Sequence, residues 1–256
     1  MSALDLIAGG ALVVVNHSGG KDSQALLIKL LGLVPRNQIL VVHASLGEFE
    51  WHGALELAQK QAAEAGVPFV VARAAKSFLD MVERKFDRVP EVPSFPSAKH
   101  RQCTSDLKRD PIDREVRAYA KQAGFSTIIS ATGIRAQESA SRAKAEVFKR
   151  NTRNSVAGRD WYDWAPIHAL STVEVFATIA AAGQEPHPAY AAGNERLSCV
   201  FCIMGSKTDI LNGALARPEL FARIAEVEAR TGYTLHMSRK SLTQLVAEAQ
   251  DLAQAA

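Results

Sequence analysis

The feature that most restricts the fold of this chain is a glycine-containing turn, Ser18–Ser23, between an apolar run and a helical pattern. The apolar run, Ala11–Val15, predicts a buried strand, and Gln24–Leu31 predicts a helix. A tight turn from strand into helix leaves the first N–H groups of the helix without intrahelical partners. Those groups and the helix dipole attract a phosphate, and the two glycines let the backbone approach it closely. The turn therefore predicts a nucleotide ligand.

Apolar runs and helical patterns alternate along the first half of the chain. The expected strands are Val13–Asn16, Ile39–Ala44, Pro68–Ala72 and Thr127–Ala131, and the expected helices are Asp22–Leu33, Trp51–Ala65, Ser77–Lys85 and Ile112–Ala123. The alternation predicts βαβ units and an α/β fold, a Rossmann-like, doubly wound, mainly parallel sheet. Ligands of such sheets bind beyond the carboxyl ends of the strands, where Ser18–Ser23 and Gly133 are expected to lie.

The second half of the chain predicts a different organisation. Ser171 and Glu174 form a capping-box pattern that opens a helix over Val173–Ala182. Further helices are expected at Thr208–Ala216, Pro218–Thr231 and Ser241–Ala253. We therefore expect a nucleotide-binding domain over residues 1–205 and a small C-terminal helical appendage over residues 206–256. The Pro-rich Arg88–Ser97 is expected to be a loop, and the Arg- and Lys-rich Ser139–Arg159 a basic loop or a solvated face.

Composition limits the class of protein further. Hydrophobic residues make up 47% and charged residues 22% of the 256 residues, and the formal net charge is +3. These values are typical of a globular domain with a full core, and they permit a phosphorylated ligand without requiring a nucleic acid. The apolar stretch Leu6–Val15 is too short to span a bilayer and lacks the preceding charges of a signal peptide, so we expect a cytoplasmic protein. The odd number of cysteines, three, argues against a disulfide framework.

The six residues Ser18-Gly19-Gly20-Lys21-Asp22-Ser23 fit neither the Walker A spacing nor the dinucleotide fingerprint. They resemble the SGGxDS signature of the PP-loop ATP pyrophosphatase superfamily. The resemblance implies that the loop holds the pyrophosphate end of ATP, with Lys21 supplying positive charge. Asp22 either caps the helix or helps to position Mg²⁺ beside the phosphates. The alternative is an ordinary turn between a strand and a helix.

Cys199 and Cys202 form a Cys-x-x-Cys pair, which by itself is compatible with a metal site or a redox dithiol. Together with Cys103 and other residues in the same order, the pair resembles the PAPS/APS reductase family of the PP-loop superfamily. The other matching residues are Lys108, Gly133-Ile134-Arg135, Ser141-Arg142, Pro166-Ile167 and His187-Pro188-Ala189-Tyr190. The resemblance implies nucleotide contacts at His43, Ala44 and Gly133. For His43 and Ala44 the alternative is an ordinary strand end with a partly exposed histidine.

Charged residues near these motifs are candidates for binding the substrate. Arg135 and Arg142 would suit a phosphate or sulfonate, because a guanidinium group donates two hydrogen bonds in a fixed geometry. The alternative for both is a surface ion pair with Glu138. Lys108, next to Arg109, is expected to lower the pKa of the Cys103 thiol, unless both are simply solvated helix charges.

Three features depart from the reductase pattern, and the last of them points to ATP rather than a sulfonucleotide. Gln102 stands where the family has the first cysteine of a pair, no cysteine follows Cys202, and the SGGKDS loop is intact. The remaining thiolates, Cys103, Cys199 and Cys202, would suit a [4Fe–4S] cluster with one open iron position, as in iron–sulfur-dependent thiolation enzymes. The alternatives are a zinc site completed by His100 or His187, or free thiols.

The sequence therefore predicts an ATP-dependent enzyme of sulfur transfer, in which adenylation releases pyrophosphate and sulfur then displaces AMP. The alternatives are a PAPS or APS reductase and a catalytically silent nucleotide-binding module. The expected partners are an adenine nucleotide and a sulfur donor protein or small thiol. The basic segment Arg142–Arg159 suits either an RNA or DNA acceptor or a lid over a small nucleotide. A homodimer is compatible with the sequence, and no membrane partner is expected.

Overall fold

The computed structural model of the chain describes residues 1–197 and 199–254, and it divides into two compact units. Unit 1 consists of Met1–Ala44, Gly53–Ala72 and Ile112–His187. Unit 2 consists of Ser45–His52, Arg73–Pro111 and Pro188–Ala256. The C-terminal helices thus share a unit with two segments from the first half of the chain. The domain boundary expected at residue 205 stays a prediction.

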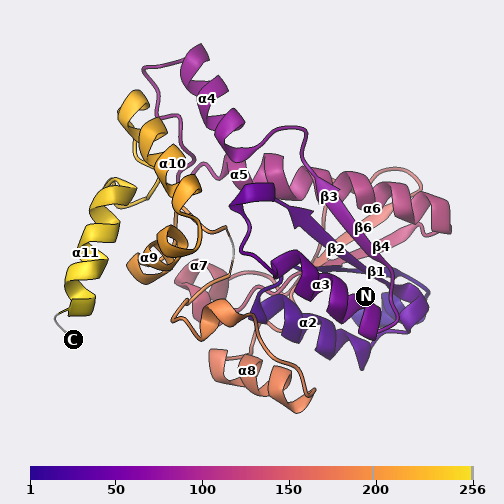
Figure 1. The fold of residues 1–256 in the computed structure, drawn as a ribbon. Helices are drawn as coiled ribbons and strands as arrows, with labels where there is room; N and C mark the ends of the chain where they lie inside the picture. Colours follow the sequence, from indigo (N-terminus) through magenta and orange to yellow (C-terminus); the bar gives the residue numbers. More distant parts are fainter. Residues whose placement is uncertain (198, 255–256) are drawn as a thin grey trace. The chain divides into compact units, whose positions relative to one another are not determined.

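A six-stranded sheet organises unit 1, with strand order β3-β2-β1-β4-β6-β5 (Figure 1). The strands are β1 (Leu12–Asn16), β2 (Ile39–Ser45), β3 (Phe69–Arg73), β4 (Thr127–Ala131), β5 (Phe148–Arg150) and β6 (Asp160–Trp164). Strand β1 pairs in parallel with β2 and β4, and β4 with β6, whereas β5 is antiparallel to β6. This confirms the expected α/β fold with a mainly parallel sheet.

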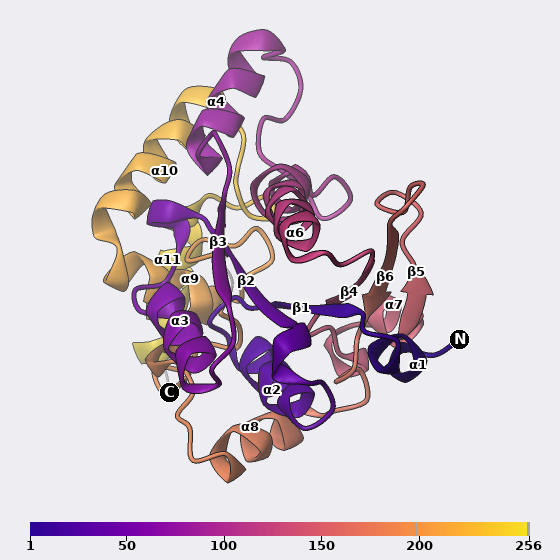
Figure 2. The same cartoon turned by 90° about the vertical axis from the view of Figure 1, so that its right-hand side faces the viewer.

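Alternating side chains of β1 build a core on each face of the sheet. Val13 and Val15 pack with Leu26, Leu27 and Leu30 of α2 (Lys21–Leu31). On the opposite face, a second cluster combines Leu12 and Val14 with Val116 and Ala120 of α6 (Asp110–Ala123). Figure 2 shows α2 and α6 on opposite sides of β1. Both faces are covered because parallel strands are joined by crossover helices, so the strands are apolar throughout.

Unit 1 also contains α1 (Ala3–Ala8), α3 (Ala54–Glu64) and α8 (Thr172–Ala181). Helix α8 begins with the expected capping box, in which Ser171 accepts from the N–H of Glu174 and the Glu174 carboxylate accepts from the N–H of Ser171. Helix α1 was not predicted, although Ser2 and Asp5 form the same kind of box there. One short helix, η1 (Arg36–Gln38), precedes β2.

The expectation of a loop or solvated face over Ser139–Arg159 is wrong in part. The segment contains α7 (Ala140–Ala143) and the edge strand β5, and it follows η4 (Ala136–Glu138). The strand forms because Phe148 stacks on Tyr162, with ring centroids 5.3 Å apart, and pairs with Trp164 across the ladder. Lys149 and Arg150 of the strand are exposed. The many charged residues of Ser139–Arg159 thus favoured the prediction of a loop, although aromatic contacts stabilise a short strand there.

Unit 2 is built mainly of helices. They are η2 (Gly47–Phe49), α4 (Phe78–Arg88), α5 (Gln102–Thr104), the π-helix η3 (Ser105–Arg109), η5 (Pro188–Tyr190), α9 (Lys207–Ala216), α10 (Pro218–Thr231) and α11 (Leu242–Gln254). The carboxylate of Glu228, in α10, is buried and accepts from the N–H groups of Leu235 and Leu242, each at 2.8 Å. Because a buried carboxylate needs such partners, these bonds fix the chain between α10 and α11.

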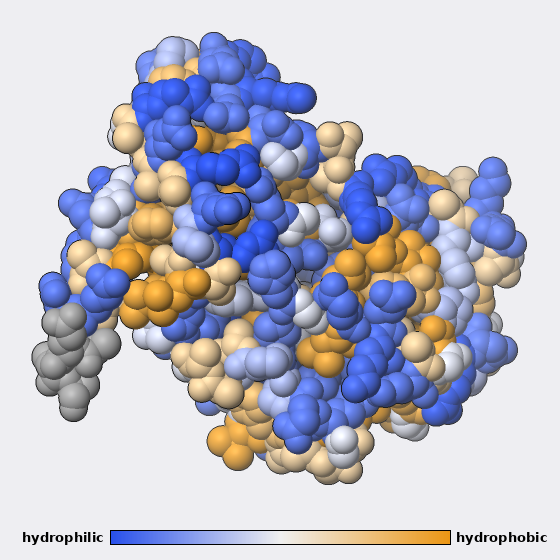
Figure 3. All heavy atoms as spheres, in the orientation of Figure 1, coloured by the Kyte–Doolittle hydropathy of each residue, from blue (hydrophilic) through white to orange (hydrophobic). Residues whose placement is uncertain are grey.

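Hydrophilic and hydrophobic residues are interspersed on the face drawn in Figure 3. Large exposed apolar side chains include Val173 and Leu215. Over the described residues, no helix combines the length and the apolar character that crossing a membrane requires.

Candidate functional site

The loop Ser18–Ser23 lies at the carboxyl end of β1, and it leads into α2 through the N-cap residue Gly20. No side chain caps α2 at this end. By contrast, α4, α8 and α9 all begin with a serine capping box. A helix start without a side-chain cap keeps its first N–H groups available for an anion. The predicted phosphate loop therefore has the backbone arrangement that its sequence implied.

Glycine is required at position 19 for two reasons. Its φ angle of +74° is in the left-handed region, and a Cβ there would lie 2.4 Å from the carbonyl oxygen of Ala54, in α3. Two side chains hold the loop from inside. The N–H of Ser18 donates to Ser23 Oγ at 3.1 Å, and the N–H of Gly19 donates to Nδ1 of His17, also at 3.1 Å. These two hydrogen bonds tie the loop to side chains of its own segment.

A second turn, after β4, packs against the start of α2. A Cβ on Gly133 would lie 3.0 Å from the backbone carbon of Asp22, so a small residue is needed at this approach. Arg135 is buried, and its Nε donates to Asp22 Oδ1 at 2.6 Å. Its other nitrogens donate to Gln137, Thr172 and the carbonyl of Leu170.

This arrangement bears on the predicted roles of two arginines. Arg135 pairs with Asp22 rather than forming the surface ion pair with Glu138 that was its alternative, and Glu138 instead pairs with Arg142. Lys21 Nζ lies 3.5 Å from the other oxygen of Asp22. The single carboxylate of Asp22 thus faces two cations. The substrate-binding roles of Arg135 and Arg142 stay predictions.

His43 and Ala44, the residues expected to contact the nucleotide, lie in the last part of β2. His43 is buried and donates from Nδ1 to the carbonyl oxygen of His17 at 2.8 Å. Its ring therefore supports the residue that precedes the loop. Ala44 is half-buried. The nucleotide contacts expected of both residues stay predictions.

Two residues behind the loop, His17 and Gln61, were missed by the sequence reasoning. Both are only 2% exposed, and Nε2 of His17 lies 2.5 Å from Oε1 of Gln61. A glutamine on the otherwise apolar face of α3, three residues after Ala58, was the one available signal. Burial, opposed by the hydrogen bond to Gln61 and assisted by the neighbouring His43, lowers the pKa of His17 to about 4.

The three cysteines and Lys108 lie in unit 2, and none of the three is in a disulfide. The backbones of Cys199 and Glu50 form an isolated antiparallel β-bridge, and the N–H of Val200 donates to the carbonyl of Phe49 at 2.9 Å. Lys108, in the π-helix η3, hydrogen-bonds Cys199. All three thiols are half-buried and interact electrostatically with this lysine or with one another. The fold of unit 2 therefore gathers the residues of the second motif.

Burial raises the pKa of the Cys199 thiol to about 11, although Lys108 opposes the rise. Burial also raises the pKa of Cys103, against the effect of Lys108. The expectation that Lys108 would leave Cys103 with a lowered pKa is therefore wrong, because desolvation outweighs the charge. The pKa of Lys108 itself is raised, chiefly by Cys199.

A metal centre is not formed by these side chains as they stand. Over residues 1–197 and 199–254, no group of three or more His, Cys, Asp and Glu side chains has the arrangement of a metal site. The donor chemistry suits iron or zinc, but the geometry does not. The expected cluster and its zinc alternative are therefore not confirmed.

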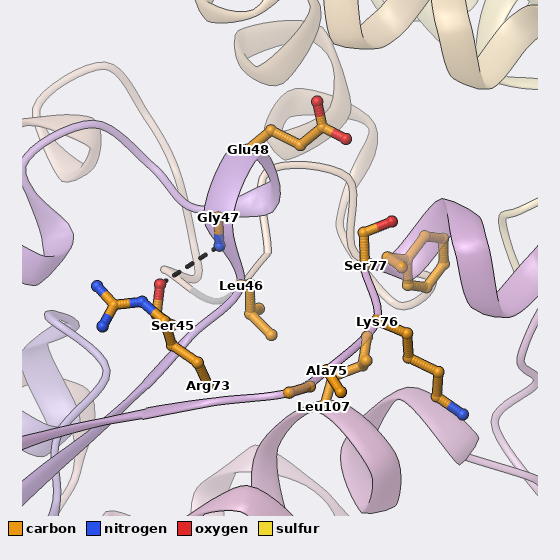
Figure 4. Close-up of a pocket in the computed structure, with 11 residues that line it drawn as sticks. Ser45, Leu46, Gly47, Glu48, Arg73, Ala75, Lys76, Ser77 and Leu107 are labelled. Carbon is orange, nitrogen blue, oxygen red and sulfur yellow. Dashed lines mark hydrogen bonds between the residues drawn. The ribbon is translucent and has the colours of Figure 1, made fainter.

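Unit 2 also contains a pocket of about 400 Å³. Its walls come from Ser45–Glu48, Arg73–Phe78 and Leu107. Figure 4 shows Leu46 pointing into the space between the first two segments, with Arg73 beside Ser45. Leu107 is followed by Lys108, and Glu48 lies two residues before Glu50, which pairs with Cys199. The pocket and the cysteines therefore share two chain segments.

The fold and the loop define a nucleotide-binding α/β domain of the PP-loop type. Residues 12–204 match the phosphoadenosine phosphosulfate reductase domain. The chain therefore belongs to the phosphoadenosine phosphosulfate (PAPS) reductase family, within the PP-loop superfamily. This is a family of nucleotide-binding enzymes of sulfur chemistry.

Two curated relatives are similar to parts of the chain. An uncharacterized 37.8 kDa protein of Escherichia phage 186 is 31% identical over 134 residues, covering 52% of this chain and 39% of that protein. An uncharacterized protein of Methanocaldococcus jannaschii is 22% identical over 220 residues, covering 85% of this chain and 48% of that protein. The chain thus spans less than half the length of these relatives.

Two solved structures are also similar. PAPS reductase from Candida auris, a phosphate complex, has a TM-score of 0.48 at 12% identity, covering 78% of this chain and 88% of that one. FMN adenylyltransferase from Candida glabrata, with FAD and inorganic pyrophosphate, has a TM-score of 0.48 at 10% identity, covering 75% and 55%. The fold itself rests on the strand order and pairing described above.

Replacing Gly19 by alanine is expected to abolish phosphate binding at the loop. The new Cβ would collide with the backbone of Ala54 and force the loop away from its φ of +74°. ATP affinity, measured by titration calorimetry, should fall at least about tenfold. Gly66→Ala is the matched control, because Gly66 has φ +65° but no atom within 4 Å of its Cβ position. Equal ATP affinity in both variants would contradict the steric argument.

The depressed pKa of His17 predicts acid sensitivity of the fold. Between pH 6.5 and about pH 4 the unfolded chain binds a proton at His17 that the folded chain excludes. The free energy of unfolding should therefore fall as the pH drops through this window, by about 3 kcal/mol from His17. Denaturant titrations of wild type and His17→Asn at several pH values test this. Parallel losses in the two proteins would assign the acid sensitivity to other groups.

Proposed function

We propose that this chain is an ATP-dependent enzyme that activates an acceptor oxygen by adenylation and then exchanges it for sulfur. The observation that carries the proposal is the intact SGGKDS loop at the start of α2, where no side chain caps the helix. A loop of this kind suits the β- and γ-phosphates that leave as pyrophosphate. The family match supports the nucleotide and the sulfur chemistry.

In the first step the acceptor oxygen attacks the α-phosphorus of ATP·Mg²⁺, and the bond to the bridging oxygen of the β-phosphate breaks. Lys21 and the N–H groups at the start of α2 would stabilise the negative charge that develops on pyrophosphate. In the second step a hydrosulfide ion attacks the activated carbon, the carbon–oxygen bond breaks and AMP leaves. Sulfur enters at the oxidation state of sulfide, so no electrons are required.

We propose that the three cysteines take part in the second step, in which sulfur is transferred to the acceptor. Cys199 and Cys103 have raised pKa values, so at neutral pH they are thiols rather than ready nucleophiles. A bound metal would convert them to thiolate ligands. We therefore propose that Cys103, Cys199 and Cys202 would hold an iron–sulfur cluster after local rearrangement.

We propose a small acceptor, bound in the pocket of unit 2 that shares segments with the cysteines. A pocket of about 400 Å³ is the size of typical small-molecule sites. The basic segment Arg142–Arg159 gives less support to a nucleic acid, because many of its charges are already paired. Arg142 pairs with Glu138, Arg150 with Asp160 and Arg153 with Asp113. The sulfur donor protein or thiol and a homodimer remain proposals.

Pyrophosphate release tests the adenylation step. With ATP·Mg²⁺, hydrosulfide and a panel of small acceptors, we expect pyrophosphate and AMP in equal amounts. Lys21→Ala should lower the rate by about 10²-fold or more. Lys60→Ala is the control, because Lys60 is an exposed lysine of α3. Release of ADP and phosphate would refute adenylation, and sulfite release from PAPS or APS with a thiol reductant would assign the reductase activity of the family.

Anaerobic purification followed by iron, sulfide and zinc analysis tests the cluster. We expect iron and acid-labile sulfide in equal amounts, lost on substituting serine for Cys103, Cys199 or Cys202. Bound zinc without sulfide would refute the cluster proposal and support the alternative, a structural zinc site. Pyrophosphate release by a chain that contains neither iron nor zinc would refute the cluster proposal and leave the adenylation proposal intact.

A further inference from the structure

A buried network of polar side chains lies behind the phosphate loop in unit 1. Its members are His17, Gln24, Gln61 and Gln184, and the first three are at most 2% exposed. Burying amides and imidazoles costs free energy unless they are hydrogen-bonded. The hydrogen bonds within this cluster are therefore expected to hold its side chains in fixed orientations.

The two ring nitrogens of His17 have different neighbours. Nδ1 faces the N–H of Gly19 at 3.1 Å, and Ser23 Oγ lies 3.4 Å from the same nitrogen. Nε2 faces Oε1 of Gln61 at 2.5 Å. A backbone N–H can only donate, so Nδ1 must be the unprotonated nitrogen, and Nε2 carries the proton that is donated to Gln61. The neighbours thus select one neutral tautomer.

Gln61 is itself oriented by the rest of the network. Its Nε2 donates to the carbonyl of Gln24 at 3.1 Å and to Oε1 of Gln184 at 2.8 Å. Gln24 Nε2 donates to the same Gln184 oxygen and to the carbonyl of Glu185, each at 3.1 Å. The amide of Gln61 therefore cannot rotate without breaking these bonds. Its oxygen remains aimed at His17.

One face of α3 supports the loop at two points. Ala54 presents the backbone that Gly19 packs against, and Gln61 presents the oxygen that fixes His17. These residues are seven apart, so they lie on the same side of the helix two turns from each other. Helix α3 therefore excludes a side chain at Gly19 through the backbone of Ala54. Through Gln61 it also orients His17, which accepts a hydrogen bond from the N–H of Gly19.

We propose that His17 is a positioning residue of the phosphate loop. The neutral imidazole holds the amide of Gly19 and thereby keeps the N–H groups of Gly20 to Ser23 directed at the phosphates. This inference rests on the proposed ATP-dependent function for its substrate. The hydrogen bond from Gly19 to His17 involves only residues of this chain, so it can be tested without a nucleotide.

Amide hydrogen exchange of the nucleotide-free protein is the first test. In His17→Leu, exchange at Gly19 should accelerate about tenfold or more, whereas exchange in the core of β1 should not change. His17→Asn, whose side-chain oxygen can still accept from Gly19, should restore much of the protection. Unchanged exchange at Gly19 in the leucine variant, with β1 intact, would overturn the proposal whether or not the protein uses ATP.

Gln61→Glu is the second test, because it places a carboxylate against His17 with little change in side-chain size, at the loss of the two hydrogen bonds that Gln61 Nε2 donates. A carboxylate at position 61 favours the protonated imidazole, which cannot accept from Gly19. His43 is the other titratable group found against His17. ATP affinity of this variant should fall several-fold between pH 8 and pH 6, whereas wild type and the exposed-residue control His52→Leu should not change. A flat pH profile would refute the positioning role, and wild type that binds no ATP would refute the proposed function instead.

Discussion

The close approach of Gly19 to the backbone of Ala54 is the constraint on which the candidate nucleotide site depends. No side chain fits between the loop and the first turn of α3, and the φ of +74° excludes most other residues in any case. The loop can approach so closely because β1 is buried on both faces and α2 is packed under it through Leu26, Leu27 and Leu30. The geometry of the loop therefore depends on the core against which β1 and α2 pack.

The sequence predicted the parts of the fold that repeat with a regular period. Strands over Ile39–Ala44 and Thr127–Ala131 and a helix over Pro218–Thr231 were found within one residue of their expected ends, because apolar periodicity and glycine or proline boundaries are local signals. Strand β5 was missed because its stability comes from Phe148 stacking on Tyr162, a contact made only after the chain has folded.

The candidate site, like the fold, was predictable only where its signal is local in the sequence. The motif residues of the loop and the cysteine motif were recognisable because each has a fixed spacing. His17 and Gln61 were not, since they act through hydrogen bonds between residues 44 positions apart. The pKa of the Cys103 thiol was misjudged because a sequence shows the charge of Lys108 but not the burial of Cys103, and burial is the larger effect here.

The charges around the loop favour a polyphosphate. Lys21 and Arg135 both face the one carboxylate of Asp22, so this group of three side chains carries a net positive charge before the helix dipole is counted. Arg135 donates to Asp22 and to three further acceptors, on Gln137, Leu170 and Thr172, whereas Lys21 Nζ lies 3.5 Å from the other oxygen of Asp22. The pair between buried Arg135 and half-buried Asp22 holds the turn after β4 against the start of α2. In the proposed function the two cations therefore have separate roles, because Arg135 fixes the surroundings of the loop and Lys21 would contact the phosphate.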